Sequence, residues 1–450
     1  MGETAVLAEF ITESTFEDIP DSAIDHAKAA IQDYLGVALY GSSHEVGTIV
    51  SGYVDAHAGS GDCTVIGREA ASPPGAALAN GAFGHAIDFD DTFESIVIHP
   101  TSPTFAAALA ASEMIDATTQ DLLRGYILGC EAAFRVGHST YPEHYQNGWH
   151  ATGTIGSFGA AATAGAILDV TADTMRQSFG IVASLSSSLK KNFGSMTKPL
   201  HAGHAAEMGL RSVLLAREGF TADDAVLEDK LGYGTVMTVG NGYDPSTITE
   251  GLGESWGVTD IGFKPYPSGV ITHAAMDAMR RLVETHDLEG DNVDEVVVTL
   301  DDAASEMLIH AQPENALQAK FSIEFCLAAI LLESRAGIHE FTDEYVGQSK
   351  VQKTVAKVTR AFEVDLFGDD YAGYGAKVTV RSSSGEEYTD EERYAPGSPN
   401  NPLDEDRIGR KFRECAETQL SDTDIDTLEQ TIASLDQSGP VSELTTILGQ

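Results

Sequence analysis

The sequence predicts a mainly α-helical protein with a smaller α+β domain. Apolar residues recur at helical spacing over most of residues 1–267. Two later runs rich in β-branched residues, 293–300 and 376–381, predict strands. With 450 residues and 42% hydrophobic content, the chain is long enough to build two domains.

The first expected helix covers residues 21–41, with Asp21 or Ser22 as its N-cap and Gly41 as its end. Ile24, Ile31 and other apolar residues lie on one face of it. Similar Ala- and Leu-rich patterns predict further helices at residues 75–87, 104–113, 119–136, 155–168, 173–187 and 204–218. The first domain, residues 1–267, is therefore expected to be almost wholly helical.

A smaller α+β domain is expected over residues 268–395. Besides the two strands it contains a Ser-Ser-Gly turn followed by a short strand at 386–388. Helices are expected at 321–332 and 348–361. Helical patterning returns in residues 396–450, and we expect this segment to pack back on the first domain, because a lone helix pair could not bury its apolar faces.

The charge is the unusual feature of the composition. The chain has 69 acidic against 27 basic residues, a formal net charge of −42. A polyanion or an anionic membrane would be repelled, so nucleic acid and membrane are not expected partners. Because concentrated salt screens such repulsion, we predict a salt-adapted, halophilic protein, with an ordinary acidic cytoplasmic protein as the open alternative.

The sequence also predicts a cytoplasmic protein. Its four cysteines, Cys63, Cys130, Cys326 and Cys415, lie far apart without the paired spacing of a zinc or redox motif, which fits a reducing compartment. The N-terminus lacks a cationic region followed by an apolar one, and no apolar run of about 20 residues occurs.

The most informative segment is GHAIDFDDTFESIVIHP, residues 84–100. It gathers these polar side chains between small and apolar neighbours: His85, Asp88, Asp90, Asp91, Thr92, Glu94 and His99. Ionised carboxylates resist burial unless they are paired or metal-bound, so the cluster indicates a site of proton transfer or cation binding.

Two other interpretations of this segment stay open. Asp90, Asp91 and Glu94 fit the D-D-x-x-E pattern that binds magnesium and diphosphate in helical synthases. The second motif that such enzymes need has only a weak candidate, which starts at Asp301 and has Ile309 at its last ligand position. The segment is alternatively a structural acidic turn or helix cap.

Local cationic character marks a second segment. Residues 174–206 contain no acidic residue but several lysines. Turn residues around Lys198 predict that it projects from a loop as an anchor for an anion, unless the loop lacks acids by chance. His201 and His204 fit an H-x-x-H metal pair, although neutral histidines bonded to backbone are commoner.

A third segment, residues 262–276, is also free of acids and lies at the expected domain boundary. It places Lys264, Tyr266 and His273 among prolines. Clefts between domains favour small-molecule sites, so His273 is a candidate for closing over a ligand, with a hinge histidine as the alternative. The glycine-rich segment 148–165 lacks dinucleotide-binding spacing and indicates close helix packing.

Several blocks together resemble the MmgE/PrpD family of 2-methylcitrate dehydratases, cis-aconitate decarboxylases and iminodisuccinate epimerases. The blocks are NGAFGHAIDFDDT, GWHATGTIGSFGAAA, KPLHAGHAAEMGL, KPYPSGVITHAAMDA and AKFSIEF. The resemblance implies a helical domain built from both chain ends, an α+β lid domain, a homodimer, and catalysis without metal or organic cofactor. It implies catalytic roles for Asp88, Thr92, His99, Lys198 and His273. Lys264, His150 and Tyr266 are further residues expected to bind the substrate, Lys264 because it adds positive charge.

The function expected from this resemblance is that of a cofactor-independent lyase acting on a di- or tricarboxylic acid. A 2-methylcitrate dehydratase-like reaction is favoured, with His99 as acid or base, Asp88 orienting it, and Thr92 binding a carboxylate or the leaving oxygen. Alternatives are a cis-aconitate decarboxylase, an iminodisuccinate epimerase and a catalytically silent binding protein. The remotest is a magnesium-dependent diphosphate lyase.

Overall fold

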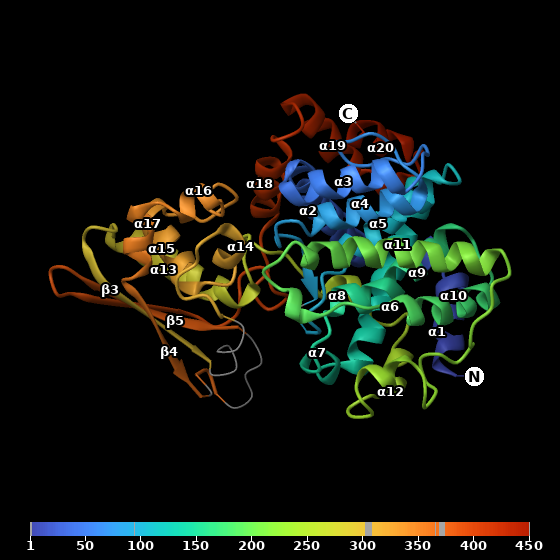
Figure 1. The fold of residues 1–450 in the computed structure, drawn as a ribbon, viewed down its shortest axis with the longest axis horizontal. Helices are drawn as coiled ribbons and strands as arrows, with labels where there is room; N and C mark the ends of the chain where they lie inside the picture. Colours follow the sequence, from blue (N-terminus) through green and yellow to red (C-terminus); the bar gives the residue numbers. More distant parts are fainter. Residues whose placement is uncertain (1, 94, 302–307, 365, 369–373, 450) are drawn as a thin grey trace. The chain divides into compact units, whose positions relative to one another are not determined.

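The computed structural model describes residues 2–93, 95–301, 308–364, 366–368 and 374–449 (Figure 1). Glu94 and residues 302–307, which contain parts of the two acidic motifs, lie outside the described residues. The chain divides into two compact units. The first combines Met1–Phe263 with Glu405–Gln450, and the second is Lys264–Asp404.

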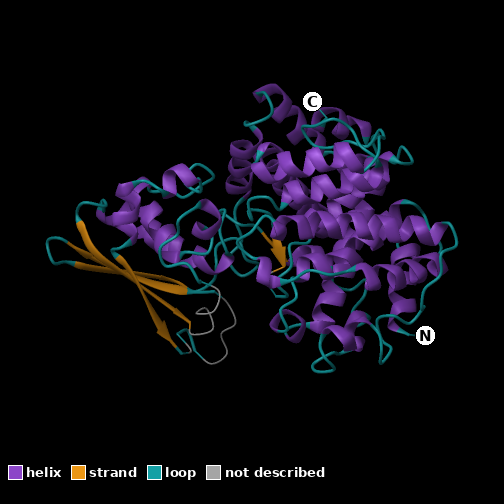
Figure 2. Cartoon of the chain, viewed as in Figure 1, coloured by secondary structure: helices purple, strands orange, loops and turns teal. Residues whose placement is uncertain are grey.

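The first unit is helical (Figures 1 and 2). Its α-helices are α1 Glu3–Glu13, α2 Asp21–Ser43, α3 Glu45–His57, α4 Pro73–Gly84, α5 Thr101–Glu113, α6 Thr119–Thr140, α7 Glu143–Gln146, α8 Ala151–Thr154, α9 Gly156–Ile167, α10 Ala172–Leu185, α11 Thr197–Arg217, α12 Tyr233–Met237, α18 Glu405–Ala416, α19 Asp422–Ala433 and α20 Ser442–Leu448. Short 3₁₀ helices occupy Phe16–Asp18, Lys190–Asn192, Pro245–Ile248, Gly257–Asp260 and Leu435–Gln437. Strands β1 Thr92–Phe93 and β2 Ile261–Gly262 pair antiparallel.

Small residues explain how the centre of this unit packs. Helix α9 is buried along its whole length, and its sequence, GSFGAAATAGAI, lets neighbouring helices approach from every side. Helices α4, α5, α6 and α11 contact one another or α9 around this centre. At the crossing of α4 and α11, a Cβ on Gly203 would lie 2.2 Å from the carbonyl oxygen of Leu78, so only glycine fits there.

The C-terminal helices complete the first unit. Helix α18 packs on α2, where a Cβ on Gly36 would already lie 3.0 Å from the Cα atom of Phe412. Lys411 of α18 forms a buried ion pair with Asp33 of α2, with 2.6 Å between Nζ and Oδ1. Residues near both ends of the chain thus share one core.

The second unit is a four-stranded sheet with helices packed against it (Figure 2). The strands β3 Val293–Asp301, β4 Val358–Glu363, β5 Ala376–Ser382 and β6 Glu387–Glu392 have the order β4-β3-β5-β6. β3 is parallel to β4 and antiparallel to β5, and β5 is antiparallel to β6. The helices are the 3₁₀ turn Val270–Thr272 followed by α13 His273–His286, α14 Ala316–Ala319, α15 Ile323–Glu333, α16 Asp343–Val346 and α17 Ser349–Val355.

The predicted fold class is confirmed, and one predicted element is wrong. Residues 348–361 do not form a single helix, because α17 ends at Val355 and the chain continues as β4. The alternating residues of β4 pair with β3 in register from Val296↔Val358 onward, and this pairing outweighs the local helical pattern.

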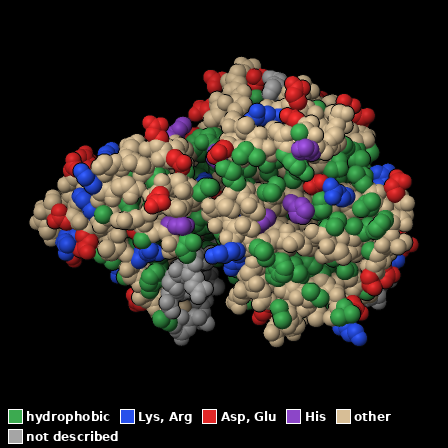
Figure 3. Space-filling view, in the orientation of Figure 1, with side chains coloured by type: hydrophobic (Ala, Val, Ile, Leu, Met, Phe, Trp, Pro, Cys, Tyr) green, Lys and Arg blue, Asp and Glu red, His purple; other side chains and the backbone are tan. Residues whose placement is uncertain are grey.

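On the face shown in Figure 3, acidic side chains are scattered rather than gathered in one patch. Among the described residues, no helix combines the length and the apolar character that a membrane span requires.

Candidate active site

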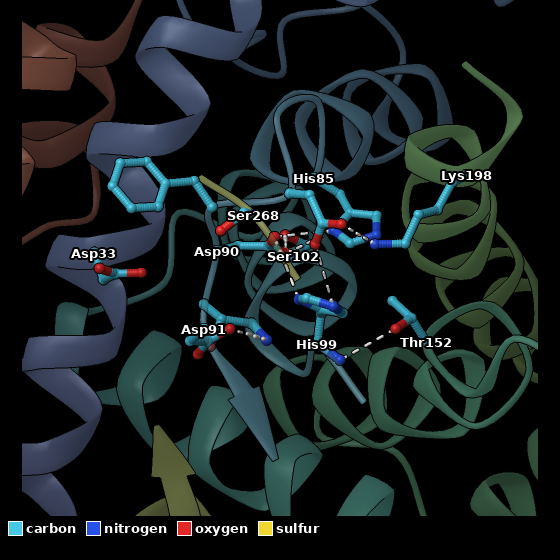
Figure 4. Close-up of polar contacts among 12 residues, drawn as sticks. Asp33, His85, Asp90, Asp91, His99, Ser102, Thr152, Lys198 and Ser268 are labelled. Carbon is cyan, nitrogen blue, oxygen red and sulfur yellow. Dashed lines mark hydrogen bonds and ion pairs between the residues drawn. The ribbon is translucent and has the colours of Figure 1, made fainter. Parts of the chain in front are cut away.

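The candidate site is built on residues 85–91, a turn that follows α4 and leads into β1 (Figure 4). This segment contains His85, Asp88, Asp90 and Asp91, all of them buried. Helix α4, which is buried from Gly75 to Gly84, fixes one end of the turn, and the pairing of β1 with β2 fixes the other. Rigid elements therefore position a group of ionisable side chains that would otherwise avoid a core.

Asp90 and His85 form the most buried pair of the cluster. The Nδ1–H group of His85 donates to Asp90 Oδ1 at 2.9 Å, and the Ser102 hydroxyl donates to Asp90 Oδ2 at 2.6 Å. Burial lowers the pKa of His85 to about 4 despite the nearby carboxylate. Burial alone would raise the pKa of Asp90, but the neighbouring imidazoles and their hydrogen bonds hold it well below the usual value. Near neutral pH the pair is thus an ionised carboxylate and a neutral imidazole.

His99 contacts two carboxylates, one with each of its ring nitrogens. Its Nδ1 atom is 3.3 Å from Asp90 Oδ1, and its Nε2 atom is 3.6 Å from Asp88 Oδ1. Its backbone N–H donates to the Thr152 hydroxyl at 3.1 Å, and its ring centroid is 4.4 Å from that of His85. A histidine held by acidic groups on both sides is well placed to exchange protons.

Lys198 lies directly beside this group. Its ammonium donates to Asp88 Oδ2 at 2.6 Å, and both side chains are less than a tenth exposed. The predicted loop position is wrong, because Lys198 lies in the first turn of α11, where Pro199 is tolerated. Asp88 has a positive φ of 58°, and the ion pair compensates for part of the cost of this conformation.

Asp91 forms its hydrogen bonds with Thr101, away from the histidines. Its carboxyl accepts hydrogen bonds from the Thr101 hydroxyl and backbone N–H, and that hydroxyl is 2.6 Å from the Tyr126 hydroxyl. Burial raises its pKa well above the usual value. Asp90 and Asp91 do not lie on a helix, so they do not present the helical D-D-x-x-E surface that the magnesium-diphosphate interpretation requires.

A second histidine pair extends the cluster towards α11. The Nδ1 atoms of His150 and His201 are 2.9 Å apart, and the His150 ring stacks 5.8 Å from that of His85. Burial, with Lys198 nearby, lowers the pKa of His150 well below its usual value. One ring must donate and the other accept in this hydrogen bond. Among the described residues, the group with metal-donor geometry does not include His201 or His204.

The structure places the remaining predicted residues as follows. Thr92 is buried in β1 opposite Gly262. In the second unit, Lys264 is buried, and the Tyr266 hydroxyl donates to Asp277 at 2.5 Å. His273 begins α13, 3.2 Å from the Ser268 carbonyl and with its ring 5.5 Å from that of Tyr266.

Four side chains of the cluster also have the donor types of a metal site. His85, Asp88, Asp90 and His99 each offer one atom, and these atoms lie within 4.8 Å of one another. The carboxylate of Asp88 already has the Lys198 ammonium at 2.6 Å, which supplies positive charge at the place where a cation would bind. Whether the protein acts without a metal can therefore be tested by measuring its activity with and without a chelator.

Two features of the site escaped the sequence analysis. The first is that the His99 ring lies closer to Asp90 than to Asp88. Asp88, which the sequence predicts as the orienting group, forms its shortest ion pair with Lys198. The second is the role of Ser102, which lies twelve positions after Asp90. The cluster of acids was visible in the sequence, but the pairing within it depends on how the turn folds.

Comparisons with known proteins cover both units. Residues 5–246 match the family model of the MmgE/PrpD N-terminal domain, and residues 266–437 match that of the C-terminal domain. The chain is 26% identical to a cis-aconitate decarboxylase of Homo sapiens, over 96% of this chain and 91% of that protein. It is also 26% identical to a cis-aconitate decarboxylase of Aspergillus terreus, over 99% and 96% of the two chains. A cis-aconitate decarboxylase-like protein, oryM, of Aspergillus oryzae is likewise 26% identical over 99% of this chain and 97% of its own.

Proposed function

The chain belongs to the MmgE/PrpD family, and on that basis we propose that it is a lyase that removes carbon dioxide from a small tricarboxylate of the cis-aconitate type. The observation that carries this proposal is that similar proteins, matched along almost the whole chain, are named cis-aconitate decarboxylases. The sequence alone favours dehydration over decarboxylation. The names of these relatives lead us to propose decarboxylation first.

The charges of the site support a polycarboxylate substrate. The surface of a protein with a net charge of −42 repels such a molecule, so the pocket must supply local positive charge. Lys198 places an ammonium beside the carboxylates of the turn, 2.6 Å from Asp88 Oδ2, and an ammonium is suited to binding a substrate carboxylate. We assign Lys198 as the anion anchor.

Decarboxylation leaves an electron pair that must be protonated on carbon. His99 is suited to deliver this proton, because Asp90 and Asp88 flank its two ring nitrogens and stabilise its protonated form. Thr92 would bind a carboxylate of the substrate. His150, whose ring stacks on that of His85, would also contact the substrate. Lys264, Tyr266 and His273 are assigned to the substrate from the family pattern.

Dehydration would use the same groups in a different order. A base would remove a proton next to a carboxylate, and an acid would protonate the leaving hydroxyl. The two reactions differ in product and not in the kinds of side chain that they need. The assay must therefore compare substrates directly.

The test is to incubate the purified protein, in concentrated KCl with EDTA, with cis-aconitate, 2-methylcitrate, citrate and iminodisuccinate, following products by proton NMR and carbon dioxide release. We expect turnover of cis-aconitate with release of carbon dioxide. Loss of water from 2-methylcitrate or citrate would favour the dehydratase. Activity that EDTA abolishes and a divalent ion restores would assign His85, Asp88, Asp90 and His99 as a metal site.

A further inference from the structure

A lysine from the C-terminal helix reaches the turn that carries the candidate site. Lys411 lies on α18 and is 6% exposed. Its ammonium donates to the backbone carbonyl of Phe89 at 2.6 Å. Phe89 stands between Asp88 and Asp90, the two carboxylates that flank His99. A residue 322 positions away in the chain thus holds the backbone between them.

The ammonium of Lys411 is itself fixed by two further contacts. It lies 2.6 Å from Asp33 Oδ1 of α2 and 4.1 Å from the centroid of the Phe89 ring. The Asp33 side chain is fully buried. A buried ammonium is tolerated only when such partners replace its water, so its position leaves little freedom.

The turn needs a contact of this kind. Residues 85–91 form no helix or strand, and Asp88 is held in the left-handed region at a φ of 58°. The direction of the Phe89 carbonyl sets the plane of the peptide that joins Phe89 to Asp90. A donor on that carbonyl therefore influences where the carboxylates of Asp88 and Asp90 point.

We propose that Lys411 is a positioning residue, which holds the 85–91 turn so that Asp88 and Asp90 stay on either side of His99. The proposal rests on the proposed function, because it assumes that this group acts on the substrate. A purely structural role predicts something else: the Asp33–Lys411 pair would then matter only for stability, and an apolar pair of similar volume would replace it.

Two variants separate these roles. Lys411→Met removes the donor but leaves Asp33 buried without its cation, so it is expected to lose stability as well as activity. The double variant Asp33→Leu/Lys411→Met removes both charges and is expected to recover most of the stability. If Lys411 positions the turn, kcat stays about 10- to 100-fold below the wild type in the double variant, with KM within about threefold.

Lys28→Met is the matched control. Lys28 also lies on α2 and pairs with the C-terminal segment, with its Nζ atom 2.6 Å from Asp436 Oδ1, but this pair involves no residue of the 85–91 turn. We expect wild-type kcat in this variant. A double variant that recovers kcat together with stability, or a loss in Lys411→Met no larger than in Lys28→Met, would overturn the proposal.

A readout that does not need turnover keeps the two proposals apart. The imidazole NMR signals of His85 and His99 report the placement of Asp88 and Asp90 even in a protein that is inactive on every substrate tried. We expect their titration to shift in the double variant and to stay unchanged in Lys28→Met. If the signals of the double variant match those of the wild type, the positioning role is wrong. If the wild type is inactive on every substrate but the signals of the double variant are shifted, only the proposed function is wrong.

Discussion

Two adjacent carboxyl groups, Asp90 and Asp91, have pKa values shifted in opposite directions. The neighbouring imidazoles and their hydrogen bonds lower the pKa of Asp90, whereas burial raises the pKa of Asp91. Of the two, Asp90 therefore holds its negative charge more firmly, and it lies next to His99. Partners, and not sequence position, decide which acid is available for chemistry.

Removing the His99 imidazole tests the proton donor. We expect His99→Asn to lower kcat by roughly 100-fold or more, the usual cost of losing a general acid or base. His144→Asn is the matched control, because His144 is also buried and hydrogen-bonded, at 3.0 Å from the Thr154 hydroxyl, but lies outside the cluster. Steady-state kinetics of both variants show whether His99 is the proton donor. A kcat near the wild-type value in His99→Asn would mean that another group transfers the proton.

Lys198 is expected to act mainly on substrate binding. Lys198→Met should raise KM by roughly 10- to 100-fold, as expected for loss of a charge-assisted contact, and should also lower kcat if the contact strengthens in the transition state. The double variant Asp88→Asn/Lys198→Met controls for the carboxylate left without its ammonium. Wild-type KM in both variants would remove Lys198 from the substrate site.

Buried neutral histidines predict a loss of stability in acid. Burial lowers the pKa of His144 to about 3, compared with about 6.5 in an unfolded chain. Between these values the unfolded state binds the extra proton, so the stabilisation is complete above about pH 6.5 and decreases as the pH falls towards 3. In urea unfolding, the stability advantage of the wild type over His144→Asn should shrink across this window; a constant difference would show that His144 is not the cause.

At the scale of elements, the crossing of α4 and α11 connects packing with the site. Helix α4 leads into the 85–91 turn, and α11 carries Lys198 in its first turn. The two helices touch where Gly203 meets the Leu78 carbonyl and where a Cβ on Gly81 would lie 2.8 Å from the Gly203 Cα. Their separation therefore affects the distance between Lys198 and Asp88.

A methyl group at this crossing should push the helices apart. We expect Gly203→Ala to destabilise the protein by about 1–3 kcal/mol, the usual cost of overpacking, and to raise KM. Gly52→Ala is the control, because a Cβ at this exposed position of α3 meets no atom within 4 Å. It should be neutral or stabilise by up to about 1 kcal/mol in urea unfolding. Equal effects of the two substitutions would contradict the role of the crossing.

Helices with a clear apolar repeat could be predicted from the sequence, as in α2 and α10, because local spacing indicates their buried faces. Strand β4 could not, since its partner β3 lies some sixty positions earlier and only the pairing distinguishes it from a continued helix. The turn residues around Lys198 suggest a loop, but Pro199 is tolerated in the first turn of a helix and does not exclude one there. The contact of Lys411 with Phe89 has no local signature at all, because it joins residues 322 positions apart.

For the whole molecule, the net charge of −42 decides the response to salt. Acidic side chains outnumber basic ones by 69 to 27, so carboxylates repel one another in dilute buffer. On the face shown in Figure 3 they lie at many separate places. The halophilic character, the homodimer and the cytoplasmic location stay predictions. The halophilic character can be tested by measuring how thermal stability depends on salt.

Stability should increase with salt. At about 1 M KCl the screening length falls to about 3 Å, so repulsion between surface carboxylates largely disappears. We expect the melting temperature to rise steadily from dilute buffer to this concentration. Sucrose of equal osmolality is the control, since it changes water activity without screening charge. A melting temperature unchanged by KCl, or raised equally by sucrose, would contradict salt adaptation.

The division of the first unit between Met1–Phe263 and Glu405–Gln450 has a consequence for biosynthesis. On the ribosome, the second unit is translated completely before α18 emerges, so it can fold while the larger unit is still missing its last helices. The surface of α2 around Asp33 and Gly36 therefore stays uncovered until α18 has been translated. Premature termination after the sheet would release a chain whose 85–91 turn lacks the Lys411 ammonium that donates to the Phe89 carbonyl.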